Sequence, residues 1–461
     1  MKRTLALGGI AAGLLASAAI AAPAQADSIP SVNLANTNLA AQQVAAFWFG
    51  QAKANLINAT PYAVETTVPT KHVSTGGVSA DDKAGVVGSS GDQKAASGNL
   101  KNVNLPKTTG KVFFIGADKK PHWCSATSVQ GQYKNLVATA GHCVYDTESN
   151  ATTLDKWVFI PGYYEGKTPW GIYVGKTAYT HYDYSVYEDG DRDYAFVTVY
   201  NGVIPTENGT HGRFVSKTFA SKWDALKYKA KLEADKTTGW SKLAVEPVFG
   251  DWKPGKPGDH KPGDWDHKPG DHKPGDWDHK PGDNKAAAPQ ELKAPEGITV
   301  PQGKRFLGWR VVGFKLSIGL KDVGTLGSNV GGQGLAYNQK IGTGIFEFGY
   351  PSGSHPDGNY AFTGKTQKWA YGKTFKAAAP SMKAEELVGI KSSFTGEGSI
   401  GSAWLYRYSN TKRLGYLNGV TIAVSDTDGN NRIDTNVSPY FDGETLAVYK
   451  QAAANWSGKI V

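Results

Sequence analysis

The chain has only two cysteines in 461 residues, so the one intramolecular disulfide it can form joins Cys124 to Cys143. Long apolar runs are also scarce. Beyond the first residues no stretch is long enough to span a bilayer, and residues 455–461 form no hydrophobic anchor. The sequence also lacks a compact basic patch with interleaved aromatic residues, which argues against a nucleic-acid-binding protein.

The composition favours a β-rich protein with many loops. Only 40% of the residues are hydrophobic, while 56 are glycine and 23 are proline, which is unlike a helical bundle. A length of 461 residues allows more than one domain, or one domain with large insertions. The formal net charge of +9 predicts solubility and a weak attraction to anionic surfaces such as cell walls.

Residues 1–26 have the pattern of a secretory signal peptide. Lys2 and Arg3 precede an apolar core at residues 5–22, and A-Q-A at residues 24–26 is a small-x-small cleavage site. We therefore expect cleavage after Ala26 and a secreted, extracellular protein, in which a disulfide would persist.

Residues 137–143, V-A-T-A-G-H-C, organise the chain around His142. They form a β-type run that ends in small residues and a Gly-His-Cys turn. Residues 111–115 and 123–129 are two further predicted strands that lead into this turn. A histidine at the end of a strand is held rigidly with one ring face open, which is what a general base requires.

The string T-A-G-H-C, with a cysteine about twenty residues before it, resembles the histidine loop of trypsin/chymotrypsin-like serine peptidases, especially the secreted bacterial branch. The resemblance implies an all-β fold of two antiparallel six-stranded barrels. It covers about residues 111–203 and 320–450, and the expected barrels are residues 111–203 and 319–461. The alternative is a histidine that is simply packed beside a cysteine.

Asp193 stands where this family has the aspartate that orients the histidine, at the start of D-Y-A-F-V-T-V. A buried carboxylate beside a hydrophobic strand is costly unless it is paired. The imidazole N–H of His142 is a suitable partner and would be fixed in one tautomer. The alternative is an aspartate that only caps a strand turn.

The resemblance returns after a gap, in G-G-Q-G-L-A-Y-N at residues 331–338, I-F-E-F-G-Y-P at 345–351 and S-P-Y-F at 438–441. Residues 27–110 are expected to be an N-terminal extension or pro-segment. Within them, residues 40–56 have apolar side chains near helical spacing and predict a helix, either packed on the domain or part of a disordered arm.

Residues 204–318 do not follow the family pattern and are predicted to be an insertion. A helix is expected at residues 216–235, with Phe219, Trp223, Leu226 and Leu232 on one side. Residues 253–284 repeat a Lys-Pro-Gly-Asp-His unit, whose prolines and glycines indicate a semi-extended linker. The histidines of this tract fit no tight metal site.

The decisive string is T-G-E-G-S-I-G-S-A-W-L at residues 395–405. Active family members have Gly-x-Ser-Gly-Gly-Pro here, and alignment on the glycines and Trp404 places Ile400 at the nucleophile position. Isoleucine cannot attack a carbonyl. Gly398 then occupies the oxyanion-hole position. Ser399 and Ser402 are the alternative nucleophiles.

Two further features of this region bear on function. The cysteines that often anchor the nucleophile loop are missing, and Phe394, at the position that often sets specificity, does not support a preference for basic residues.

Residues 426–434 resemble a calcium loop but lack its glycine and its final acidic ligand, so a polar hairpin is expected.

The sequence therefore predicts a secreted, monomeric homologue of trypsin-like peptidases that retains His142 and Asp193 and has lost catalysis. It is expected to act by binding a protein, a peptide or the cell-wall surface. No cofactor or metal is expected. The first alternative is an active endopeptidase that uses Ser399 or Ser402. The second is a wall-associated structural protein in which the repeat tract is the functional part.

Overall fold

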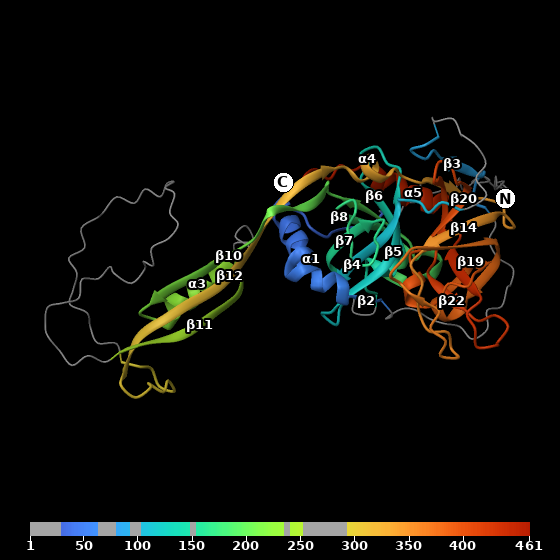
Figure 1. Ribbon diagram of the computed structural model, residues 1–461. Helices are drawn as coiled ribbons and strands as arrows, with labels where there is room; N and C mark the ends of the chain where they lie inside the picture. The colour runs from blue at the N-terminus through green and yellow to red at the C-terminus, as the bar shows by residue number, and fades with distance from the viewer. Residues whose placement is uncertain (1–28, 63–79, 93–102, 148–153, 235–239, 252–292) are drawn as a thin grey trace, which may run out of the picture.

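The computed structural model describes residues 29–62, 80–92, 103–147, 154–234, 240–251 and 293–461 (Figure 1). The predicted signal peptide, its cleavage site and the repeat tract lie outside these residues.

A closed barrel of six antiparallel strands forms the first half of the body. Its strands pair around a ring in the order β4-β5-β6-β9-β8-β7, and β7 closes on β4. They are β4 (Thr109–Ile115), β5 (Pro121–Val129), β6 (Leu136–Thr139), β7 (Asp155–Pro161), β8 (Tyr173–Thr180) and β9 (Ala195–Val199). The predicted all-β fold and first barrel are confirmed.

The second half of the body consists of two sheets and a two-stranded ribbon. One sheet has the order β17-β14-β20-β21-β13-β3, the other β18-β19-β23-β22, and β15 pairs with β16. The strands are β3 (Gly85–Val87), β13 (Gly334–Tyr337), β14 (Gly344–Gly349), β15 (Ser352–Gly353), β16 (Phe362–Thr363), β17 (Lys368–Lys373), β18 (Phe375–Ala379), β19 (Ala384–Lys391), β20 (Ala403–Ser409), β21 (Leu414–Val420), β22 (Ala423–Ser425) and β23 (Thr435–Pro439). A closed second barrel stays a prediction.

The N-terminal segment packs on the first barrel. Helix α1 (Asn38–Asn58) contains the predicted helix, and the Thr37 side chain caps it by accepting the Ala40 N–H at 3.1 Å. Its buried Trp48 donates from Nε1 to the Lys156 carbonyl at 2.6 Å. Two short strands flank the helix: β1 (Ser31–Asn33) pairs with β8, and β2 (Thr60–Pro61) pairs with β5.

The other helices are short. They are α2 (Tyr182–Tyr187), α3 (Lys222–Ala234), α4 (Leu326–Val330) and α5 (Gly443–Ala453). Among the described residues, no helix combines the length and the apolarity needed to cross a bilayer.

The insertion forms a long arm that projects from the body (Figure 1). Its three strands, β10 (Gly202–Phe219), β11 (Trp240–Asp251) and β12 (Lys304–Gly324), pair in the order β10-β12-β11. At about 3.3 Å per residue, the 21-residue β12 is about 70 Å long. The sequence did not predict this sheet.

The prediction of a helix at residues 216–235 is partly wrong about its extent and wrong about which side chains face inward. Strand β10 continues to Phe219, so α3 begins only at Lys222. Its inward face carries Ala225, Tyr228 and Leu232, spaced by three and four residues, and these pack on the sheet. Trp223 and Leu226, predicted on the same side as Leu232, are exposed instead.

Candidate active site

His142 is held by a covalent anchor and by the strand before it. It lies in a single 3-10 turn, Gly141–Cys143, two residues after β6 ends at Thr139. Cys143 forms the predicted disulfide with Cys124 of β5. The carbonyl of Cys143 also accepts a hydrogen bond from Trp157 Nε1 at 3.0 Å. The loop that presents the imidazole is therefore fixed at its C-terminal side.

Asp193 lies against His142, as the sequence predicts. Its Oδ2 is 2.7 Å from His142 Nδ1, and its Oδ1 accepts the backbone N–H of His142 at 2.9 Å. Both side chains are buried. An ionised carboxylate can only accept, so Nδ1 carries the proton and Nε2 is the basic nitrogen. This is the arrangement that a histidine general base needs.

Ile400 occupies a core position between the two halves of the body. It follows the 3-10 turn Glu397–Ser399, is fully buried and belongs to the same hydrophobic cluster as Cys124. The backbone N–H of Ser125 donates to the Ile400 carbonyl at 2.8 Å. Next to it, Gly401 has a φ of +81°, and a Cβ there would overlap the Ser125 carbonyl oxygen, so only glycine fits.

The backbone of this loop does not present a free oxyanion donor at Ile400. The Ile400 N–H donates to the Glu397 carbonyl at 3.3 Å, and the Ser399 N–H donates to the Gly396 carbonyl at 3.1 Å. An oxyanion hole requires backbone N–H groups aimed at the developing charge. Here a carbonyl oxygen already occupies the position in front of the Ile400 N–H. Gly398, the predicted oxyanion-hole residue, lies within the same turn.

The two alternative nucleophiles are also buried. Ser399 Oγ donates to the Thr395 carbonyl at 2.6 Å. Ser402 Oγ lies against Gly349 and has no hydrogen-bond partner in the part of the chain that the structure describes. Phe394, at the specificity position, is buried and contacts the ring of Phe362. Neither serine exposes its hydroxyl to a substrate in this conformation.

A buried lysine lies beside the loop, and the sequence analysis did not single it out. Lys111 pairs with Ser125 across β4 and β5, and Ser125 Oγ in turn donates to the Gly398 carbonyl at 2.9 Å. Its ammonium group lies 3.2 Å from the ring centre of Trp123 and 4.6 Å from that of Tyr163. Burial lowers the pKa of Lys111 well below its usual value. A lysine in the apolar run K-V-F-F-I was the available signal.

A buried glutamate in β14 was also missed. Glu347 Oε1 accepts hydrogen bonds from Thr421 Oγ1 and Asn436 Nδ2, both at 2.6 Å, and Oε2 accepts one from Ser392 Oγ at 2.7 Å. Burial raises the pKa of Glu347, although these hydrogen bonds oppose the rise. These contacts join strands β14 and β23 with the segments that follow β19 and β21. The charged residue inside F-E-F was the signal.

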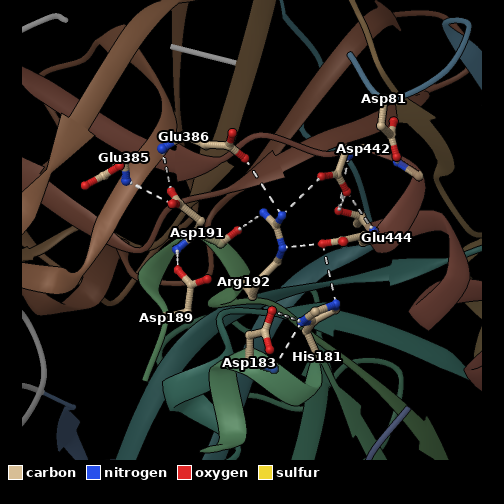
Figure 2. A network of polar contacts seen from close by, with 12 residues as sticks. Asp81, His181, Asp183, Asp189, Asp191, Arg192, Glu385, Glu386, Asp442 and Glu444 are labelled. Carbon is tan, nitrogen blue, oxygen red and sulfur yellow. Dashed lines mark hydrogen bonds and ion pairs between the residues drawn. The ribbon is translucent and has the colours of Figure 1, made fainter. Parts of the chain in front are cut away.

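A polar network joins the segment before Asp193 to the second half of the body (Figure 2). Arg192 Nε is 2.5 Å from Glu444 Oε2 at the start of α5, and its Nη2 is 3.7 Å from Asp442. Asp191 accepts the backbone N–H groups of Glu385 and Glu386 at 2.9 and 2.7 Å. Burial raises the pKa of Asp191 to about 6. Through Asp191 and Arg192, the network connects the segment that precedes Asp193 to β19 and to the start of α5.

The predicted polar hairpin at residues 426–434 is present between β22 and β23. The Asp426 carboxylate accepts the backbone N–H groups of Gly429 and Asn431 at 3.0 and 2.8 Å. The described residues contain no group of three or more histidine, cysteine or acidic side chains that could hold a metal. The histidines of the repeat tract lie outside them.

No protein-family model and no curated protein matches the chain. Among solved structures, it is similar to the protease Anisep from Arthrobacter nicotinovorans, with 18% identity and a TM-score of 0.43 over 77% of this chain and 99% of that one. It is also similar to the thermostable serine protease AL20 from an extremophilic microorganism, with 16% identity and a TM-score of 0.42 over 76% and 98%. A Glu endopeptidase matches with 13% identity and a TM-score of 0.39 over 77% and 95%. The structural neighbours are trypsin-like serine proteases, and at these identities the likeness concerns the fold alone.

Proposed function

We propose that this chain is a secreted protein with a serine-peptidase fold that has lost catalysis and acts by binding a protein or peptide. The observation that carries the proposal is the state of Ile400: its side chain is buried in the core, and its N–H is bonded to the Glu397 carbonyl. An isoleucine side chain has no group that can act as a nucleophile, and the hydrogen bond to Glu397 occupies an oxyanion donor. Acyl transfer needs both.

The retained pair His142 and Asp193 does not contradict this proposal, because it also has a structural role. Asp193 satisfies two N–H groups of His142 in the protein interior. A buried donor left without an acceptor costs about 1–3 kcal/mol. The pair would therefore persist after catalysis was lost. The pattern of residues 1–26 supports export, since it is that of a signal peptide.

A fluorophosphonate probe, which labels activated serines, tests the loss of catalysis. We expect no labelling of the wild-type chain by mass spectrometry under conditions that label an active serine peptidase completely. Stoichiometric labelling at Ser399 or Ser402, abolished by His142→Ala, would contradict the proposal and establish the alternative of an active endopeptidase.

The variant Ile400→Ser separates the two losses. We expect it to remain essentially unlabelled, because a hydroxyl alone does not release the Ile400 N–H from the Glu397 carbonyl. Ile400→Ala is the matched control for the loss of core volume. Full labelling of Ile400→Ser would show that the loop rearranges readily, that the oxyanion donors are available and that only the nucleophile is missing.

Binding and cleavage can be measured in one experiment with a mixed peptide library. The protein is incubated with the library, and bound peptides are recovered and identified by mass spectrometry. Recovery of enriched, intact peptides supports a binding function. Recovery of cleaved products, absent with His142→Ala, would establish a peptidase, and no enrichment at all would overturn the peptide-binding part of the proposal.

A further inference from the structure

Helix α3 on the arm has two apolar faces, and only one of them is covered. The inward face packs on the sheet, where Phe306, Trp309 and Val311 are buried beneath it. The outward face carries Trp223 and Leu226, whose exposed fractions are 67% and 45%. The exposed Ala230 continues the same face. Adjacent exposed apolar side chains with a polar rim are typical of sites that bind proteins or membranes.

Lysines surround the outward face. Lys222, Lys227 and Lys231 are exposed, and the ammonium group of Lys227 lies 4.9 Å from the ring centre of Trp223. Two acidic residues, Asp224 and Glu233, offset part of this positive charge. Glu233 forms an ion pair with Lys229. The face is therefore apolar at its centre and positively charged at its edge.

The arm carries α3 away from the body (Figure 1). Strands β10 and β12 leave the first barrel together and pair along most of their length, with a register shift between Pro205 and Thr210. Helix α3 therefore lies apart from the candidate site in the body.

We propose that the outward face of α3 binds an anionic lipid surface, with Trp223 and Leu226 inserted at the headgroup level and the lysines on lipid phosphates. Tryptophan and leucine on one face with lysines at its edge is the pattern of helices that lie in the membrane interface. Each lysine near an anionic surface strengthens binding about fivefold.

Two other partners fit the same face less well. A soluble polyanion would use the lysines but would leave Trp223 and Leu226 in water. A groove on another protein takes anchors at positions i, i+3 or i+4 and i+7 of a helix, and the third such position is Ala230, which is too small to fill a pocket. This inference rests on the arm alone and is independent of whether the body is catalytic.

Co-sedimentation of the full chain with vesicles tests the proposal, using phosphatidylcholine alone and phosphatidylcholine mixed with phosphatidylglycerol. We expect binding to the mixed vesicles and much weaker binding to the neutral ones. In Trp223→Ala/Leu226→Ser, the partition coefficient should fall by about tenfold or more. In Lys222→Gln/Lys227→Gln/Lys231→Gln, it should fall on the mixed vesicles only. All variants carry the same residues 1–26, so these residues contribute equally to vesicle binding in every variant.

The matched control is Trp369→Ala, which removes a half-exposed tryptophan from β17 in the body and should bind as the wild type does. All substitutions are at exposed positions, and circular dichroism verifies folding. Three results would overturn the proposal: no binding of the wild type to mixed vesicles, equal binding of the α3 variants and the wild type, or equal loss with Trp369→Ala. Binding to dextran sulfate that depends on the lysines, with vesicle binding that does not depend on Trp223, would assign the face to a polyanion instead.

Discussion

The two sides of the candidate site are held in place in different ways. On the first-barrel side, His142 is fixed by the disulfide and by both oxygens of Asp193, in an arrangement suited to a general base. On the other side, the loop at Ile400 has become core: its side chain is buried and its N–H is satisfied within the loop. Both sides therefore contribute to the stability of the fold, one through hydrogen bonds and a disulfide and the other through apolar burial.

Under the proposed loss of catalysis, the histidine side would be kept because removing Asp193 leaves two buried N–H groups of His142 without an acceptor. The loop has no such constraint, because an isoleucine at the nucleophile position gains apolar burial without losing a hydrogen bond. Burying such a side chain stabilises a fold by about 1.5–3 kcal/mol. Selection for stability alone would therefore preserve one side of the site and change the other.

The largest effect should come from removing the disulfide, in Cys124→Ala/Cys143→Ala. The bridge closes a loop with a sequence separation of 19, for which chain entropy predicts a loss of about 3 kcal/mol. The free energy of unfolding in urea measures it, and reducing agent should destabilise the wild type but not the double variant. A loss below about 1 kcal/mol would show that the histidine side is held mainly by packing.

The second effect concerns the opposite side of the site. Ile400→Ala should lower the free energy of unfolding by about 2–3 kcal/mol, and Ile400→Val by about 1 kcal/mol, because both leave a cavity in the core. Ile57→Ala is the matched control, since Ile57 is 62% exposed and should cost little. Equal effects at the two isoleucines would show that Ile400 has not become a core residue.

The sequence predicted the contact between His142 and Asp193 and the disulfide, because short strings resembling a known family carry these residues. One strand, one turn and one cysteine pair place His142, and the costly burial of Asp193 requires a partner close by. The arm was missed because β10 and β12 pair only through contacts between residues about a hundred positions apart. The apolar residues of α3 were assigned to one face because the sequence does not show which of two stripes meets a sheet.

A charged residue in an apolar strand was the only sequence signal for the two buried charges, and it does not show their partners. Lys111 and Glu347 each stand in an apolar strand, and only the fold shows what surrounds them. In the fold, the Lys111 ammonium group lies over an aromatic ring, and the Glu347 carboxylate accepts three hydrogen bonds. The hydrogen bond from the Ile400 N–H to Glu397 is likewise a property of the loop conformation, which the residue types do not determine.

A third effect separates structure from catalysis on the histidine side. Asp193→Asn keeps the size of the side chain but places an amide NH₂ against one of two N–H donors of His142. We expect a loss of about 2 kcal/mol in stability, from one buried donor left unsatisfied. Asp224→Asn, on the exposed face of α3, is the control. A loss as small as that of the control would mean that the pair is retained for another reason.

The smallest effect is a pH dependence at the junction of the two sides. Burial raises the pKa of Asp191 to about 6, from about 3.8 in the unfolded chain, with Asp189 adding to the rise and Arg192 opposing it. Between these values the folded state binds more protons than the unfolded state, so stability should fall as pH rises from about 4 to about 6.

Asp191→Asn should remove this pH dependence, because the amide does not titrate. Its overall stability should be somewhat lower, since one of the backbone N–H groups of Glu385 and Glu386 loses its acceptor. Glu188→Gln, at an exposed position nearby, should keep the slope of the wild type. Urea unfolding at a series of pH values measures the slope. If Asp191→Asn retained it, another carboxyl group of the network, such as Asp442, whose pKa is also raised by burial, would be responsible.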